Sequence, residues 1–538
     1  MAVAALRNIL KEWQVLIGIE THAQIKSSRK LFSGSLAAVP DDVHNSHVSL
    51  FDAAYPGTLP RLNHYCVDLA LRTALALNCD VQRKSSFDRK HYFYPDLPSG
   101  YQITQQYQPL ARNGFLEIAS NSSSTLKKVG IKQIQLEQDT AKSTFNPRTR
   151  TSNIDLNRAG TGLMEIVSQP DIQSPEEAAA YVRTLQAVLR AVGSSDGNME
   201  QGSLRCDVNV SINRPGEPPG TRCEIKNLNS VKFMVAAIGH EVIRQHGILT
   251  APKDPSMSES PRVKQETRGF DEHQFETYSL RAKEEAPDYR YMPDPNLGVL
   301  VLSESRIQSI AESLPELPPA IRLRLQEKYA LPERDVDVLL SIDSGRDVGF
   351  DGRPGTGGAI AYFDALCQGA NTRGETASRK RDPKVVSNWM THELLGQLTA
   401  RKESFKVTAI TAGQLGELID LVQDGTITGT SGKFLLRHML ANPSHRPPLE
   451  IATELQMLAV SSEQSSSTSS TDLASPDAYL NELVEGAFNA LPSEVAALRA
   501  GREGVLNKVV GWVMKQSRGR VDANKVKALV KQKVVKDS

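Results

Sequence analysis

The sequence predicts an α+β fold in which a mainly antiparallel sheet occupies the first part of the chain and helices occupy the rest. Segments that alternate apolar and polar side chains, as half-buried strands do, recur between residues 13 and 300. Helical stretches lie among them without the regular strand–helix alternation of a parallel sheet. From "SLPELPPAIRLRL" (313–325) onward the pattern is mostly helical.

The length of the chain, 538 residues, predicts two to four domains at about 150 residues each. We expect one domain over 1–300 and a helical domain over 301–460. A Ser-rich flexible linker, "SSEQSSSTSSTDLASPD", follows at 461–477, and a basic helical tail covers 478–538.

The stretch "VLIGIETHAQI" (15–25) is the strongest strand signal. Apolar and small side chains occupy the odd-numbered positions, while Glu20 and His22 occupy even-numbered positions together with a glycine. Side chains two apart on a strand point the same way, so the carboxylate and the imidazole lie side by side on one face.

Three more segments, "QIQLEQDTAK" (133–142), "RCDVNVSI" (205–212) and "TRCEIKNLNS" (221–230), repeat this division into an apolar and a polar face. The polar parity carries acids, amides and bases: Gln133, Gln135, Glu137 and Asp139; Arg205, Asp207, Asn209 and Ser211; Arg222, Glu224 and Lys226. A half-buried antiparallel sheet whose other face meets water accounts for any one of these strands. Four such strands together indicate one continuous polar face, which we call the polar floor, that forms a functional site.

Helix signals stand between these strands. Asn63 precedes "HYCVDLALRTALALN", and Ser174 is a natural N-cap that Glu177 completes as a capping box, with Gly193 at the helix end. A third helix is expected over 231–247.

Composition excludes several classes of protein. No apolar run approaches the ~20 residues that span a bilayer, so we expect no integral membrane association. The five cysteines lack CxxC spacing, which argues against a disulfide framework and a zinc site. The Gly-rich segment at 345–359 lacks GxxxxGK[ST] and predicts an exposed loop rather than a phosphate-binding loop. Net charge is +1, so any nucleic-acid surface must be local.

The residue types on the polar face favour a cation and phosphates. Convergent carboxylates with one histidine suit a hard divalent cation such as Mg²⁺, which binds carboxylate oxygens together with phosphates. Arg205, Lys226 and the "DRK" at 88–90 would neutralise those phosphates. The residues alone therefore predict a metal–phosphate cradle on a sheet, without naming its substrate.

At these positions the sequence closely resembles the GatB family, the B-type subunits of the glutamyl-tRNA(Gln) amidotransferases. The resemblance is carried from about Trp13 to Pro295 by "IGIETHAQI", "FDRKHYFYPDLPSGYQITQ", "LEQDTAKS", "DLNRAGTGLMEIVSQPDI", "GSLRCDVNVS", "EIKNLNS" and "DYRYMPDP". It implies a catalytic cradle resembling glutamine synthetase, followed by a helical domain and a YqeY-like all-α tail.

The resemblance also implies an activity. Members of that family use ATP and Mg²⁺ to phosphorylate the glutamyl side chain of misacylated Glu-tRNA(Gln). Ammonia from a partner, the A-type amidase subunit, then gives Gln-tRNA(Gln). A small third subunit, C-type or a fungal-type replacement, completes the heterotrimer.

Carried over by motif, the expected catalytic and metal-binding residues are Glu20, His22, Glu137 and Glu224, with Lys90 as a catalytic lysine near the ammonia passage. The expected ATP- or phosphate-binding residues are Arg89, Arg205 and Lys226. One departure is Gln138, where bacterial members have a glutamate that they use near the metal. Mitochondrial members commonly carry this glutamine. Glu165 could be a further ligand or a carboxylate that caps backbone groups.

The tail is the most basic part of the chain. From 499 to 538 eleven Lys or Arg face three Asp or Glu, and we expect two helices there, one of them capped by Asp522. A charge run is often only a solvated face, but a basic face is also the footprint of a polyanion. We expect tRNA to bind at Lys515, Arg518, Arg520 and Lys525.

Two other functions compete with this one. A glutamine synthetase-like ligase acting on a free amino acid would have no need of the basic tail. A non-catalytic tRNA-binding scaffold would have no reason to keep the acids and the histidine on polar faces.

"MAVAALRNILKE" (1–12) is either a short presequence or a helical lead-in. The mitochondrial-type "LEQD" favours a mitochondrial matrix protein.

Overall fold

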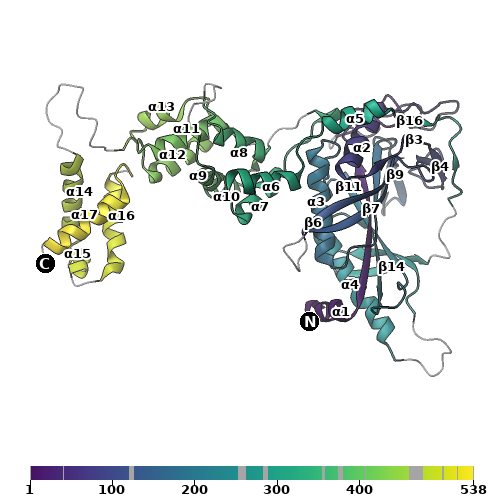
Figure 1. The fold of residues 1–538 in the computed structure, drawn as a ribbon, viewed down its shortest axis with the longest axis horizontal. Coiled ribbons are helices and arrows are strands. Elements are labelled where there is room, and N and C mark those ends of the chain that lie inside the picture. The colour runs from purple at the N-terminus through teal and green to yellow at the C-terminus, as the bar shows by residue number, and fades with distance from the viewer. Residues whose placement is uncertain are drawn as a thin grey trace. The chain divides into compact units, whose positions relative to one another are not determined.

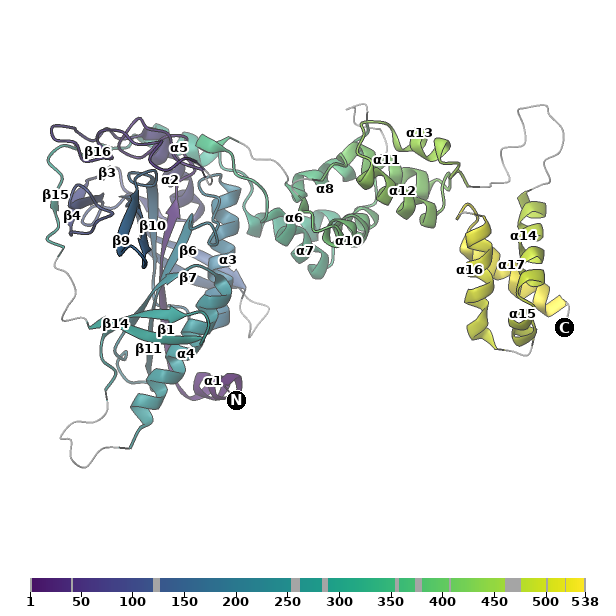
Figure 2. The same ribbon diagram turned by 180° about the vertical axis from the view of Figure 1, so that it is seen from behind.

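The computed structural model describes residues 2–39, 42–119, 126–252, 262–282, 289–353, 358–372, 380–405, 408–459, 476–499, 502–517 and 519–536. The chain divides into two compact units (Figures 1 and 2). The first comprises 1–321 and 346–356, and the second comprises 322–345 and 357–538. The finer domain boundaries expected from the sequence stay predictions, and most of the Ser-rich linker at 461–477 lies outside the described residues.

A nine-stranded sheet forms the centre of the first unit. Every strand pair in it is antiparallel except β12 with β13. The mainly antiparallel sheet is therefore confirmed. Its strands, in spatial order, are β14 (Glu276–Ala282), β13 (Glu266–Asp271), β12 (Cys223–Leu228), β11 (Leu204–Asn213), β1 (Gln14–Gln24), β10 (Gly162–Ser168), β7 (Leu126–Gln138), β6 (Ala111–Ala119) and β2 (Asp80–Val81).

Three small sheets surround this large one. The most important for the site has the order β15 (Met292–Pro293), β4 (Asp88–His91) and β5 (Tyr101–Thr104). The other two pair β16 (Leu300–Val301) with β3 (Lys84–Ser85), and β8 (Lys142–Asn146) with β9 (Thr151–Asp155).

Helices cover the apolar face of the large sheet. They are α1 (Ala2–Glu12), α2 (His64–Ala76), α3 (Pro175–Ala191) and α4 (Val231–Thr250), and α5 (Glu304–Glu312) packs on α2. Helices α3 and α4 pack side by side against β6 and β11 (Figure 1). The core includes Ile17, Ile19, Val208 and Val210 from the strands. Ile9 of α1 is buried in the same core, so residues 2–12 pack as part of the unit.

The expected helix signals are largely confirmed. The Asn63 side chain accepts a hydrogen bond from Tyr65 N and caps α2. Ser174 likewise accepts from Glu177 N and caps α3. The expected capping box is wrong in one half, because the Glu177 carboxylate accepts from Gln173 N (2.9 Å) and from Lys127 Nζ (2.8 Å). Lys127 of strand β7 and the backbone N–H of Gln173 therefore share this carboxylate. Helix α4 ends at Thr250, three residues beyond the expected glycine.

The second unit is helical, as the pattern predicted. Helix α6 (Pro318–Tyr329) spans the boundary after residue 321. The helices beyond it are α7 (Glu333–Asp343), α8 (Ala359–Cys367), α9 (Pro383–Asn388), the π-helix η3 (Trp389–Leu394), α10 (Leu395–Ala400), α11 (Ala412–Gln423), α12 (Gly429–Ala441), α13 (Pro448–Glu454), α14 (Pro476–Ala490), α15 (Pro492–Arg499), α16 (Leu506–Gln516) and α17 (Ala523–Lys536). Short 3₁₀ turns add η2 (Phe350–Gly352) in the first unit and η5 (Glu503–Val505) in the second.

The last four helices share a small core of their own. It includes Val509 and Val513 of α16 with Val526 and Val530 of α17. The two basic helices expected at the end of the chain are confirmed, and Asp522 Oδ1 accepts from Asn524 N at 2.6 Å at the start of α17.

All five cysteines are buried free thiols, in agreement with the absence of a disulfide framework. Among the helices that the structure describes, none combines the length and the apolar character that crossing a membrane requires.

Candidate active site

The polar side chains of neighbouring strands come together on one face in the middle of the large sheet. Along β1, burial alternates residue by residue, as its sequence pattern predicted. The register sets His22 opposite Glu165 of β10 on one side and Arg205 of β11 on the other. Glu20 stands opposite Asp207 of β11. Strand pairing therefore brings together acids and bases that are far apart in the sequence.

Three of these side chains converge closely. His22, Glu137 and Glu165 each offer one ligand atom, and these atoms lie within 4.8 Å of one another. They form the one such histidine–acid group of three in the described part of the chain. Glu137 and Glu165 are 2% and 7% exposed, so these are buried acids and not a solvated edge.

This polar face does not simply meet water, because strand β5 lies against β7 and covers part of it. Gln102 of β5 donates from Nε2 to Glu137 Oε1 at 3.0 Å. Gln135 of β7 donates from Nε2 to Glu165 Oε2 at 2.6 Å. The interpretation as a half-buried sheet with a wet face is therefore wrong at this point of the sheet.

One oxygen of the acid cluster lacks a partner. Glu137 Oε2 is buried and has no hydrogen-bond partner among the described residues. Lys90 Nζ lies 4.0 Å from it and 5.2 Å from the centre of the Tyr289 ring. Burial disfavours the charged form of Lys90, but the nearby charges of Glu137 and Glu165 outweigh it and raise the pKa of this lysine.

Glu165 and Glu20 differ in the direction of their pKa shifts. Burial and the charges of Glu137 and Glu20 raise the pKa of Glu165 well above its ordinary value. For Glu20, burial acts in the same direction, but hydrogen bonds with His22 and Glu165 prevail and lower its pKa. His22 Nε2 lies 3.4 Å from Glu20 Oε1, and Glu20 raises the pKa of the imidazole despite its burial. Without a bound cation, Glu165 is the carboxyl group that keeps its proton.

A second acid–base group lies on the next strands. Lys226 Nζ of β12 contacts Asp207 Oδ2 at 2.9 Å and Glu224 Oε1 at 3.2 Å. Burial opposes its charge, but these two acids and Glu20 raise the pKa of Lys226. Lys226 therefore links the predicted residue Glu224 electrostatically to Glu20.

Arg205 is tied to another acid at the end of β7. Its Nη2 lies 2.9 Å from Asp139 Oδ1, while its buried Nε has no hydrogen-bond partner among the described residues. Arg158 and Gln24 also approach Asp139, at 3.8 Å and 3.4 Å. Asp139 thus holds a guanidinium that keeps one donor for another group.

Two residues singled out from the sequence face elsewhere. Arg89 donates from Nε to Asp294 Oδ2 at 2.7 Å and stacks on the Tyr101 ring at 4.1 Å, whereas its neighbour Lys90 turns toward the acid cluster. The Gln138 side chain accepts from Ile103 N at 3.4 Å, and it is not one of the three convergent ligands. In this chain Gln138 supports strand β5.

The histidine, the carboxylates and the orphaned oxygen fit a divalent cation. Oxygen ligands supplemented by one imidazole nitrogen are a donor set that Mg²⁺ or Mn²⁺ accepts. His22, Glu137 and Glu165 would hold such an ion, with Glu20 beside them. A cation would also offset the mutual repulsion of the buried carboxylates, which Lys90 and the protonation of Glu165 relieve only in part.

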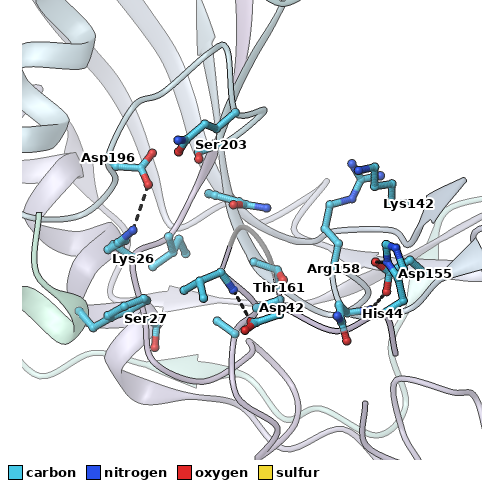
Figure 3. A pocket seen from close by; sticks show the side chains of 18 residues that line it. Lys26, Ser27, Asp42, His44, Lys142, Asp155, Arg158, Thr161, Asp196 and Ser203 are labelled. Carbon is cyan, nitrogen blue, oxygen red and sulfur yellow. Dashed lines mark hydrogen bonds and ion pairs between the residues drawn. The ribbon is translucent and has the colours of Figure 1, made fainter. Parts of the chain in front are cut away.

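A polar pocket (Figure 3) lies next to the end of β1, where Gln24 continues the row of polar side chains that includes His22. Its volume is about 660 Å³, and its walls carry Gln24, Lys26, Lys142 and Arg158. Its basic and acidic side chains are partly paired, as in Lys26 Nζ with Asp196 Oδ2 at 3.1 Å. The Gly-rich segment contributes Phe350 to this wall.

That segment departs from the exposed loop expected from its sequence. Asp351 accepts hydrogen bonds from Ser28 N at 2.9 Å and from Ser27 Oγ at 3.0 Å. Its carboxylate therefore fastens the segment to the chain that follows β1.

The tail residues predicted to bind tRNA lie in the second unit. Lys515 and Lys525 are exposed, and Arg520 is half-buried and donates from Nε to Ser517 O at 3.3 Å. Arg518 lies outside the described residues.

Comparison with known proteins shows the family of the chain. The model of the GatB/GatE catalytic domain matches residues 15–308, and the model of the GatB domain matches residues 374–534. The mitochondrial B-type subunit of glutamyl-tRNA(Gln) amidotransferase from Laccaria bicolor is 64% identical over 524 residues, which is 97% of this chain and 92% of the relative. The mitochondrial protein of the same name from Mycosarcoma maydis is 44% identical over 96% of this chain and 85% of its own.

A bacterial relative agrees along the whole chain as well. The B-type subunit of the aspartyl/glutamyl-tRNA(Asn/Gln) amidotransferase from Rickettsia bellii is 40% identical over 97% of this chain and 98% of its own. The chain therefore belongs to the GatB family, and the resemblance seen in the sequence is confirmed.

The sequence motifs singled out His22 and Glu137, named Glu165 only as a possible ligand, and missed the glutamines that hold the acids. Glu165 is central to the cluster, but in "GLMEIVS" it stands in an apolar run without clear alternation. Gln102 and Gln135 were not expected at the site, because a glutamine carries no signal of its own. The signal that could have found them is register, since Gln135 is opposite Glu165 in the β7–β10 pair.

Proposed function

We propose that this chain is the component of a tRNA-dependent amidotransferase that activates the glutamyl side chain of Glu-tRNA(Gln) with ATP. The convergence of His22, Glu137 and Glu165 beside Lys90 carries the proposal. The product is Gln-tRNA(Gln), which makes the enzyme a glutamine-hydrolysing glutaminyl-tRNA synthase. The names of the relatives, B-type subunits of amidotransferases, support this class of reaction.

The reaction has two balanced steps. A side-chain carboxylate oxygen of the tRNA-bound glutamate attacks the γ-phosphorus of ATP, and the bond to the bridging oxygen breaks. This gives γ-glutamyl phosphate and ADP. Ammonia then adds to the acyl carbon, the phosphate leaves with the former carboxylate oxygen, and the nitrogen loses one proton.

This chain's own residues position and neutralise the reacting groups. Mg²⁺ bound at the acid cluster would supply positive charge to the phosphate oxygens. The raised pKa keeps Lys90 protonated at neutral pH, so it adds a fixed cation next to Glu137. Arg205, held by Asp139 with its Nε free, and Lys226 are the candidates for further phosphate contacts.

The proposal includes partners and a place in the cell. The A-type amidase subunit would supply the ammonia, and a small third subunit, C-type or its fungal-type replacement, would complete the complex. The exposed lysines of α16 and α17 would contact the tRNA body. The relatives named mitochondrial support a mitochondrial location, and we place the complex in the matrix. The sheet with its polar floor is the cradle that we compare with glutamine synthetase.

Reconstitution tests the proposal. The chain is purified with its amidase partner and incubated with Mg²⁺, glutamine and Glu-tRNA(Gln), with and without ATP. We expect Gln-tRNA(Gln) to form only with ATP. Amidation of free glutamate at the same rate would favour the ligase alternative. Binding of tRNA without any ATP turnover would favour the scaffold alternative.

A further inference from the structure

Each buried glutamate of the acid cluster is held by a glutamine amide. Gln102 Nε2 donates to Glu137 Oε1 and also to the backbone oxygen of Gln138. Gln135 Nε2 donates to Glu165 Oε2 at 2.6 Å and to Thr104 Oγ1 at 3.2 Å. Gln102 and Gln135 are themselves 5% and 3% exposed. The hydrogen bonds are therefore shielded from competing water.

The orientation of both amides is determined by their carbonyl oxygens. Tyr92 Oη donates to Gln102 Oε1 at 2.9 Å. Gln133 Nε2 donates to Gln135 Oε1 at 2.5 Å. Because a donor occupies each carbonyl oxygen, each NH₂ group must face the carboxylate. A flipped amide would set an oxygen against a carboxylate and lose two hydrogen bonds.

The two amides leave one oxygen of Glu137 open. Oε1 is bound by Gln102, while Oε2 has no hydrogen-bond partner among the described residues. Glu137, Glu165 and His22 each offer one ligand atom, and these three atoms lie within 4.8 Å of one another. An amide donor holds a carboxylate without adding the positive charge that would compete with a cation.

We infer that Gln102 and Gln135 are positioning residues for a divalent cation, with Tyr92 setting the orientation of Gln102. The inference rests on the proposed function, because it presumes that the acid cluster holds the cation of the reaction. It adds the small sheet that carries β5 to the site, as the element that orients Glu137 from above the polar floor. Partners that orient metal ligands in this way commonly account for about 10–100-fold in metal affinity.

The test is Mn²⁺ binding to the full chain without ATP or tRNA, measured by electron paramagnetic resonance of free Mn²⁺. Gln102→Leu removes the amide, and we expect the Kd for Mn²⁺ to rise about 10–100-fold. Tyr92→Phe removes only the hydroxyl that orients the amide, so it should cause a smaller rise. In the Gln102→Leu background Tyr92→Phe should add nothing, because its effect passes through the amide.

Gln245 of helix α4 provides a matched control. It is also buried, and its Nε2 donates to Glu241 Oε1 at 2.8 Å and to Val210 O at 3.1 Å, away from the acid cluster. Gln245→Leu therefore removes the same two kinds of hydrogen bond and should leave the Kd for Mn²⁺ unchanged. Thermal unfolding of each variant checks that it is folded, and Tyr92→Phe serves if Gln102→Leu is not.

The outcomes separate this inference from the proposed function. Mn²⁺ binding that is weaker in the Gln102 and Tyr92 variants and unchanged in Gln245→Leu supports the inference. Equal Kd values for wild type, Gln102→Leu and Tyr92→Phe would overturn it and leave the proposed cation site in place. A wild-type chain that binds no Mn²⁺ would overturn the cation site itself.

Discussion

Replacing Glu165 by glutamine should stabilise the protein in the absence of a divalent cation and abolish its response to one. Glu165 is a buried acid that avoids repulsion from Glu137 and Glu20 only by holding a proton, so a neutral isostere removes the cost of keeping it protonated. The amide oxygen of the new side chain can still accept the hydrogen bond from Gln135. The substitution therefore keeps this hydrogen bond and removes a group that must otherwise be held protonated.

The size of the effect follows from the geometry of the cluster. Two unit charges at 4.8 Å, the separation that bounds the ligand atoms, repel by about 3–4 kcal/mol at an effective dielectric constant of about 20. Lys90, at 4.0 Å from Glu137, offsets part of this repulsion, and the proton that Glu165 retains relieves more. We expect a net gain of about 1–2 kcal/mol in the free energy of unfolding. At about 2–4 °C per kcal/mol this is a rise of a few degrees in Tm.

Thermal unfolding in EDTA and in excess Mg²⁺ measures both halves of the prediction. At a hundredfold excess over Kd a cation adds about 2.7 kcal/mol to a protein that binds it. The order of stability should thus reverse, with Glu165→Gln above wild type in EDTA and below it in Mg²⁺. A variant that is less stable than wild type in EDTA and gains as much from Mg²⁺ would refute this electrostatic account.

Three further predictions concern the site, the fold and the tail. His22→Ala should lower ATP-dependent transamidation by about 10²–10³-fold in a chain that melts normally; near-normal turnover would remove His22 from the mechanism. Glu241→Gln should cost about 2–4 kcal/mol near neutral pH, because it removes the buried carboxylate that Arg268 (Nε 3.2 Å from Glu241 Oε2) and Arg244 share and leaves Arg268 with Glu266 alone. Burial opposes its charge, but hydrogen bonds from Arg244 and Gln245 and the charges of Arg244 and Arg268 lower the pKa of Glu241, so its contribution is present above about pH 4.5 and is lost as pH falls. Denaturation of wild type and variant at several pH values measures this, and a stability difference that stays the same in acid would contradict it. Charge reversal at Arg520 and Lys525 should weaken tRNA binding and flatten its dependence on salt, and equal slopes in a salt series would identify the tail as a solvated face.

The polar floor was predictable because strand side chains alternate strictly. In β1 the alternation by itself places Glu20 and His22 on the same face. The same rule separates Arg89 from Lys90, because adjacent residues on β4 cannot both face the acids. Only Lys90 does so. The motif alone does not make that distinction.

Other parts of the site depend on pairing across the sheet, which no local pattern reveals. Glu165 sits between Met164 and Ile166, both fully buried, in a strand that is buried along most of its length. Because its neighbours in the sequence are all apolar, no alternation of polar and apolar residues shows which face of the strand Glu165 lies on. Gln102 reaches Glu137 from a separate sheet, through a contact between β5 and β7 that depends on the tertiary fold.

The origin of the oxygen in the released phosphate tests the central claim most directly. Glu-tRNA(Gln) carrying ¹⁸O in both side-chain carboxylate oxygens is incubated with the reconstituted complex, ATP, Mg²⁺ and glutamine, and the inorganic phosphate is analysed by mass spectrometry. If the carboxylate attacks the γ-phosphorus at this site, each phosphate released with Gln-tRNA(Gln) carries one ¹⁸O atom. Formation of Gln-tRNA(Gln) with phosphate that contains no ¹⁸O would contradict activation through an acyl phosphate.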